Sequence, residues 1–497
     1  MNEVRILARQ TFIYGFGTIV PRFLNYGILT FLYTRLFDKG EYGVVTELYG
    51  WMVFLLIILT YGMETGFFRY AQKEEDYEKV YSTSMISLLF SSALFLILVN
   101  LFIAPVASAL KYEDNPGYIR LFAAIVATDA FMAIPFARLR RENKALLFSV
   151  LKIFNVLITV AAVLFLFVIA PGLYEKDSRL VSSFYNPAYG VGYVFVANLI
   201  GSVSTLIVLL PYTFRVKLLF DRHLWFRMIS YSLPLMIAGL GGAVNETLDK
   251  VIMRRVAGEE TGLEMVGEYG AGYKIAVLMS LFIQMFRFAA EPFFFERAKR
   301  EGAKATYAYV MKYFILAMLL VYLVINLYIN GFKYIIGESF RESVKVVPVV
   351  GMGYLLYGIY VNHSIWYKLN DLTRFGIYIT FSGALVTVLI NVFLIPSYGY
   401  MASAWAHVAS YGVMIILSFI MAEKRYKIDY GMIKMLPYFV IAVMIVVFVN
   451  FARYNNTAVE LLINTMLLVS FILFAQYRDK LLTVIFGKEN VENQNNK

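Results

Sequence analysis

Cysteine is absent from this chain of 497 residues, and charged side chains are scarce. Without cysteine, the chain can form no disulfide, no thiolate nucleophile and no cysteine-ligated metal site. Charged residues make up only 16% of the chain, against roughly 25% in a typical soluble protein. Because 60% of the residues are hydrophobic, so much apolar surface cannot be buried in a water-soluble core. A lipid bilayer is therefore the expected solvent.

Motifs for catalysis and for nucleotide binding are also missing. The sequence contains no HExxH zinc motif, no phosphate loop of the form GxxxxGKS or GxxxxGKT, and no convincing nucleophile motif. These absences argue against an enzyme and against ATP-driven transport within this chain, and we expect no cofactor and no bound metal. The net charge of +11 is interpreted as a signal of membrane topology, so nucleic acid is not an expected partner.

Long apolar segments are abundant. A helix needs about 20 mostly apolar residues to cross the hydrocarbon core, and the chain offers about fourteen such stretches. The sequence therefore predicts an all-α polytopic membrane protein. The opening segment MNEVRILARQTFIYGFG has no small-residue cleavage site, so we expect it to be kept as the start of the first span. The expected spans are 10–34, 42–68, 81–109, 118–139, 146–170, 188–212, 227–253, 267–295, 306–329, 344–366, 374–395, 399–422, 433–451 and 457–476.

The distribution of Lys and Arg predicts how the chain crosses the membrane. If the N-terminus is inside, the inner segments hold more than twice as many Lys and Arg residues as the outer segments. Cytoplasmic loops carry such an excess, so we expect both termini to be cytoplasmic. No loop is long enough to form a separate domain.

A four-residue sequence, GEYG, occurs at 40–43 and again at 267–270. We interpret each copy as a turn on the outer face, the first before span two and the second before span eight. A second pair of related segments, NPAYGVGY at 186–193 and IPSYGYMASA at 395–404, leads into spans six and twelve. Segments that recur six spans apart on one face indicate a parallel duplication. We therefore predict two six-helix lobes at 1–217 and 218–426, two additional transmembrane helices at 427–480, and a polar cytoplasmic tail at 481–497.

Four segments resemble a known family. They are TFIYGFGTIVPRFLNYGILTFLYTRLF followed by DKGEYG, YSLPLMIAGLGGAVNETLDKVIM, FRFAAEPFFFE and LIPSYGYMASAWAHV. The chain, over about 5–480, resembles the polysaccharide flippase branch of the multidrug/oligosaccharidyl-lipid/polysaccharide exporter superfamily. The resemblance implies alternating access in the bacterial cytoplasmic (inner) membrane. It implies a substrate that is an oligosaccharide on a polyprenyl pyrophosphate, contact with membrane lipid, and glycan polymerase and glycosyltransferases as partners.

Charged residues inside spans are functional candidates, because a charge at mid-bilayer costs about 2.5–3.5 kcal/mol or more and usually faces an interior cavity. Arg22 lies near the middle of span one with Asn25 on the same helical face, and a guanidinium suits phosphate, so we predict that both bind substrate. Lys274 and Arg287 in span eight are the other predicted substrate-binding residues. The alternative for each cation is an ion pair, and Arg287 could be neutralised by Glu291 four residues on.

Four carboxylates are candidates for coupling to H⁺ or Na⁺. Asp129 lies in span four and Glu64 in span two, whereas Glu246 and Asp249 follow the glycine-rich AGLGGA in span seven. Because glycine loosens a helix, the charged outer half of span seven could move as a gate. The alternative for each carboxylate is a structural pair with a cation, such as Lys250.

Two other functions stay open on the sequence alone. A multidrug cation antiporter of the same fold would have an acidic cavity; Arg22 and Lys274 disfavour it, and so do fourteen spans where such exporters usually have twelve. A membrane-embedded polysaccharide polymerase would carry a large outer loop, which this sequence lacks. Glycosyltransferase genes beside this one would favour the flippase.

Overall fold

Helices account for the regular secondary structure in the described part of this computed structural model, residues 20–72, 76–176, 179–214, 217–298, 300–370, 372–452 and 456–479. Among the described residues, twelve helices are long and apolar enough to span a membrane, and α13 (Glu259–Ala276) with the first part of α14 (Leu278–Arg297) forms an apolar helix pair bent by 45° that makes thirteen if it is one span. The first predicted span, 10–34, is described only from residue 20. The predicted all-α polytopic fold is confirmed.

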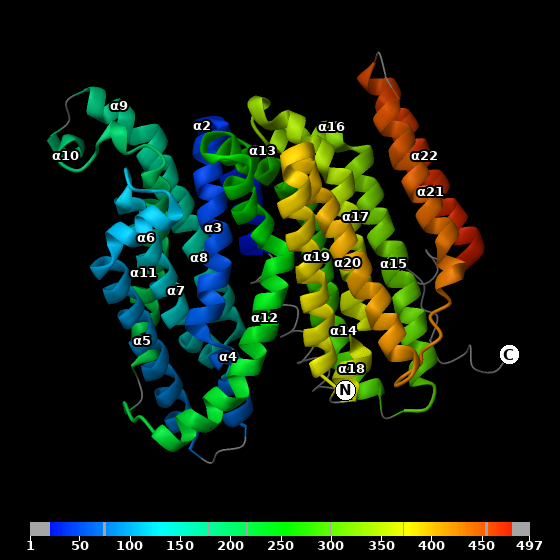
Figure 1. Cartoon of the computed structure of the whole chain (residues 1–497), viewed down its shortest axis with the longest axis horizontal. Coiled ribbons are helices and arrows are strands. Elements are labelled where there is room, and N and C mark those ends of the chain that lie inside the picture. Colours follow the sequence, from blue (N-terminus) through cyan, green and yellow to red (C-terminus); the bar gives the residue numbers. More distant parts are fainter. Residues whose placement is uncertain are drawn as a thin grey trace. The chain divides into compact units, whose positions relative to one another are not determined.

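The chain forms two compact units that divide after Gly270. In the first unit, α7 is the most buried candidate span, and it contacts α3, α4, α5, α8 and α11. Figure 1 labels the α-helices of this unit. The elements of the unit are η1 (Asn25–Leu29), α2 (Thr30–Leu36), α3 (Lys39–Thr60), α4 (Met63–Tyr70), α5 (Tyr77–Leu101), α6 (Ile103–Leu110), α7 (Pro116–Arg141), α8 (Ala145–Leu164), η2 (Phe165–Ile169), α9 (Ala170–Glu175), α10 (Arg179–Ser182), η3 (Pro187–Tyr189), α11 (Gly192–Thr213), α12 (Arg222–Ala257) and the start of α13.

The second unit contains the end of α13 and all later helices. Here α17 and α19 pack on α20, and α15 contacts α17, α21 and α22. The last two helices lie along one edge of this unit (Figure 1). Its elements are α14, α15 (Ala303–Leu327), α16 (Ile329–Phe332), η4 (Lys333–Ile335), η5 (Glu338–Val346), α17 (Val347–His363), α18 (Ile365–Leu369), α19 (Arg374–Tyr398), α20 (Tyr400–Glu423), α21 (Met432–Phe451) and α22 (Thr457–Asp479).

Acidic side chains fix where two long helices begin. At α3, the Asp38 carboxylate accepts a hydrogen bond from the Glu41 amide at 2.8 Å, and the Glu41 carboxylate accepts one from the Asp38 amide at 3.2 Å. This reciprocal capping satisfies two amides that the first turn leaves without partners. At α12, Asp221 accepts from the Leu224 amide and pairs with Lys79 at 2.6 Å, which lowers the Asp221 pKa to about 2.

The interpretation of GEYG as a turn is wrong. The first copy lies inside α3 and the second inside α13. Helix α3 already begins at Lys39 because Asp38 caps it, so the glycines are helical residues. The predicted lobe boundary at 217/218 follows the sequence repeat, whereas the compact units follow packing and divide after Gly270. The boundaries at 217, 426 and 480 therefore stay predictions, and the tail at 481–497 lies outside the described residues.

Candidate functional site

Five charged side chains of the first unit form what we call the charge cluster: Arg22, Glu64, Asp129, Arg140 and Lys152. Lys152 interacts electrostatically with each of the other four. Arg22 precedes η1, which contacts α8; Glu64 belongs to α4, Asp129 and Arg140 to α7, and Lys152 to α8. Charged side chains from three spans, and from the helical residues just before η1, thus lie in one region.

Arg22 and Asn25, both predicted to bind substrate, are exposed in the structure. Asn25 begins the π-helix η1, a kind of irregularity that is frequent at functional sites. In the described part of the chain, the Arg22 guanidinium makes no ion pair. Tyr26, one turn further on, interacts electrostatically with both Arg22 and Glu246 of α12. A predicted substrate residue and a predicted coupling residue therefore share one neighbour.

Glu64 is paired directly with a cation. Its carboxylate accepts a short hydrogen bond from the Arg140 guanidinium, and both side chains are about two-fifths exposed (41% and 43%). The Arg140 guanidinium also lies 4.9 Å from the centre of the Phe68 ring. Glu64 therefore has a direct cationic partner.

Asp129 and Lys152 lie within electrostatic reach of each other but form no direct pair. Asp129 accepts a hydrogen bond from the Ser202 hydroxyl of α11 at 2.8 Å. The Lys152 ammonium lies 4.0 Å from the centre of the Phe136 ring. Lys152 was not among the predicted site residues, although a lysine inside the apolar stretch 146–170 was a signal for it.

The charged residues of α12 that the sequence analysis names lie partly in buried and partly in exposed positions. Asp249 and Lys250 are buried and form an ion pair at 3.0 Å. The Lys250 ammonium also donates to the Glu246 carbonyl at 3.2 Å and lies 5.5 Å from the Tyr269 ring centre. Glu246 itself is exposed. Asp249 thus has a fixed structural partner.

In the second unit, the alternative in which Glu291 neutralises Arg287 is not what the described residues show. Glu291 pairs instead with Lys368 of α18 at 2.6 Å, because α14 and α18 are in contact. Arg287 is exposed, and no ion pair involves it in the described part of the chain. Lys274 is partly buried on α13 and is not free of interactions.

A buried ion pair near one end of α3 was not predicted. Glu47 of α3 and Arg254 of α12 lie 2.6 Å apart, with side chains only 1% and 5% exposed. The Tyr112 hydroxyl donates to the same Glu47 oxygen at 2.8 Å, and Arg254 donates to the carbonyls of Leu110 and Lys111. Glu47 and Arg254 both lie near the ends of the expected spans 42–68 and 227–253, where charges are ordinary. Together these bonds join α3, α12 and the end of α6.

The two GEYG copies pack against each other. A Cβ on Gly43 would lie 2.0 Å from the carbonyl oxygen of Leu263, and one on Gly267 would lie 1.9 Å from the carbonyl oxygen of Lys39. Each glycine therefore admits the backbone of the other helix. Glu268 in the second copy also pairs with Lys39 at 2.9 Å. We call this the glycine contact.

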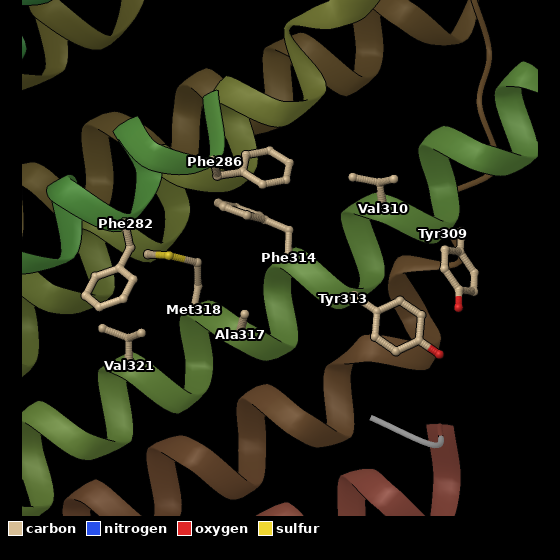
Figure 2. Close-up of a pocket in the computed structure, with 9 residues that line it drawn as sticks. All are labelled: Phe282, Phe286, Tyr309, Val310, Tyr313, Phe314, Ala317, Met318 and Val321. Carbon is tan, nitrogen blue, oxygen red and sulfur yellow. The ribbon is translucent and has the colours of Figure 1, made fainter. Parts of the chain in front are cut away.

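An apolar pocket of about 380 Å³ lies between α14 and α15 in the second unit. Figure 2 shows Phe282 and Phe286 on one side of it, facing Phe314, Met318 and Val321. Its surface suits a hydrocarbon chain and carries none of the predicted charged residues.

Comparison with solved structures shows the fold. The chain is similar to the lipid II flippase MurJ in an inward closed conformation, with 13% identity, a TM-score of 0.68, and coverage of 95% of this chain and 99% of that one. It is also similar to an inward-facing multidrug resistance MATE family transporter of the MOP superfamily, with 16% identity, a TM-score of 0.62, and coverage of 83% and 94%. No curated protein matches the chain significantly.

Comparison with protein families gives the assignment. The model of the family described as "Polysaccharide biosynthesis protein" matches residues 7–298, which is more than half of the chain. The chain therefore belongs to this family.

Proposed function

We propose that this protein moves an oligosaccharide linked to a polyprenyl pyrophosphate across the bacterial cytoplasmic membrane. The observation that carries the proposal is a pair of cations in the first unit, Arg22 and Lys152, that have no direct ionic partner among the described residues. A pyrophosphate is strongly anionic, and the planar guanidinium offers a donor fork for its oxygens. The sugar would pass through the protein while the polyprenyl chain stays in lipid.

The glycine contact supports transport by alternating access. Backbone atoms of α3 and α13 meet there without intervening side chains, and two ion pairs at the same end, Lys39–Glu268 and Lys111–Glu259, add to the contact. We propose that this end is the outer one, that both termini are cytoplasmic, and that the contact separates when the protein opens outward.

Energy coupling is proposed to use a carboxylate that can exchange its cation. Glu64 and Asp249 already have direct cationic partners, Arg140 and Lys250. Asp129 is bonded to a serine hydroxyl, so it is our first candidate for taking up H⁺ or Na⁺ in one state and releasing it in another. Glu246 is the second candidate, because it is exposed and shares the neighbour Tyr26 with Arg22.

The multidrug cation antiporter is the competing function, because MATE transporters share the fold. A cation would be repelled by Arg22 and Lys152, so a binding site that contains them favours an anion. We place the polysaccharide polymerase below both, because no described feature supports it.

The test is lipid-linked oligosaccharide flipping in proteoliposomes, followed with a fluorescent headgroup and a membrane-impermeant quencher. Arg22→Ala should reduce the flipping rate by about tenfold or more, since a charged hydrogen bond is lost, and Arg22→Lys should keep part of the activity. Arg35→Ala is the matched control: Arg35 follows on α2 and is exposed, but its guanidinium donates to the Phe31 carbonyl and stacks on the Phe31 ring. Wild-type flipping by Arg22→Ala would remove Arg22 from the site.

A further inference from the structure

Lys152 combines features that a structural lysine in a membrane span does not usually show. A charge held in a span normally pairs with an opposite charge or a backbone carbonyl. The Lys152 ammonium makes no hydrogen bond or ion pair in the described part of the chain. Its close contact is the Phe136 ring, 4.0 Å away, and that ring is itself fixed edge-on by Phe148 at 5.5 Å. An aromatic face attracts an ammonium but does not use up its three donors.

The carboxylates near Lys152 are already engaged. Glu64 is bonded to Arg140, and Asp129 is bonded to Ser202. Both attract Lys152 at longer range, while Arg22 and Arg140 repel it. The ammonium is thus kept in place by a ring and by distant charges, and its donors are not used by any acceptor in the described part of the chain.

The position of Lys152 relates it to the proposed substrate site. Helix α8, which carries Lys152, is contacted by η1, the π-helix that follows Arg22. Arg22 and Lys152 repel each other electrostatically, and among the described residues neither has a direct ionic partner. An anion with two charged groups would relieve this repulsion better than an anion with one, because each cation would receive its own partner.

We propose that Lys152 is a second phosphate-binding residue, which together with Arg22 selects a pyrophosphate over a monophosphate. The proposal rests on the proposed function, and it adds a residue and a headgroup preference to it. Asp129 acts as a positioning residue: its charge holds the ammonium near Phe136 when no substrate is bound. Lysine suits this role because its ammonium is a compact point charge on a flexible stem.

The test compares binding of farnesyl pyrophosphate and farnesyl monophosphate to the purified full-length protein in nanodiscs. Wild type should bind the pyrophosphate more tightly. Lys152→Met should weaken pyrophosphate binding about 10- to 100-fold, as expected for one lost charged hydrogen bond, and should change monophosphate binding much less. Lys152→Arg should restore most of the preference. Lys304→Met is the matched control, because the Lys304 ammonium also lies over a ring, 4.7 Å from the centre of Tyr426, but outside the charge cluster.

The outcomes separate this proposal from the proposed function. If wild type binds neither compound, both are overturned. If Arg22→Ala loses pyrophosphate binding while Lys152→Met keeps the full preference, only the role of Lys152 is overturned. Should Lys152→Met fail to fold, the double variant Lys152→Met/Asp129→Asn removes the unbalanced carboxylate. Recovery of the wild-type preference in that double variant would show a structural lysine and would also overturn the proposal.

Discussion

A buried ion pair is costly to break from one side, and Glu47–Arg254 is the clearest case in the described part of the chain. Arg254→Met would leave the Glu47 carboxylate buried with only the Tyr112 hydroxyl as its partner. We expect a loss of about 3–5 kcal/mol in the free energy of unfolding, the range seen when one partner of a buried pair is removed. Thermal unfolding of the purified protein in detergent measures it.

The neighbouring arginine provides the control. Arg255 is exposed and donates one hydrogen bond to the Ala109 carbonyl, so Arg255→Met should change stability by less than about 1 kcal/mol. Equal effects of the two substitutions would mean that the pair with Glu47 does not hold α12 to α3.

Single charged residues could be found from the sequence, but their partners could not. Arg22, Glu64 and Asp129 stand out because charges are rare inside apolar spans. Their partners lie on other helices: Arg140 is 76 residues from Glu64, and Ser202 is 73 residues from Asp129. For Glu291, spacing along one helix indicates Arg287 as a partner, but a lysine from α18 pairs with it instead.

Among the elements, the spans were predicted well and the GEYG segments were not. Span length follows from bilayer thickness, so apolar runs locate helices reliably. Adjacent glycine and tyrosine residues are typical of a turn. However, Asp38 followed by Glu41 is a capping pattern, and it indicates that a helix begins at Lys39. Why glycine recurs in both copies became clear only from packing, where each copy admits the backbone of the other.

Gly267→Ala should disrupt the glycine contact. The new methyl group would lie 1.9 Å from the Lys39 carbonyl oxygen, and a helical backbone cannot move aside alone, so α3 and α13 must separate locally. We expect the free energy of unfolding to fall by about 1–3 kcal/mol, which is typical of overpacking. We also expect α3 and α13 to be apart at this contact in a larger fraction of the molecules. The first measurement is thermal unfolding. The second is the rate at which a bifunctional reagent bridges two cysteines introduced by Lys39→Cys and Glu268→Cys.

Gly412→Ala is the control for a helical glycine, because nothing lies within 4 Å of the added methyl group on α20. It should be neutral or slightly stabilising, since alanine is the better helix former. Unchanged bridging at 39 and 268 in Gly267→Ala would contradict the packing argument.

For the whole molecule, sequence reasoning gave the membrane class, the approximate span number and the family, because all three depend on features spread along the chain. It gave neither the division after Gly270 nor the packing of α13 residues on α3. Such packing depends on side-chain volume at single positions, and no hydrophobic pattern reports it.

Alternating access predicts that fixing the glycine contact stops transport. Lys39→Cys/Glu268→Cys replaces an ion pair whose charged ends lie 2.9 Å apart, and the chain has no other cysteine to react. Because these are long side chains, a reversible bifunctional thiosulfonate reagent suits them better than a direct disulfide. Bridging should abolish flipping of the lipid-linked oligosaccharide in proteoliposomes, and reduction should restore it. Each single cysteine variant, treated alike, should keep its rate. A bridged protein that flips substrate at the unbridged rate would mean that this contact does not open during transport.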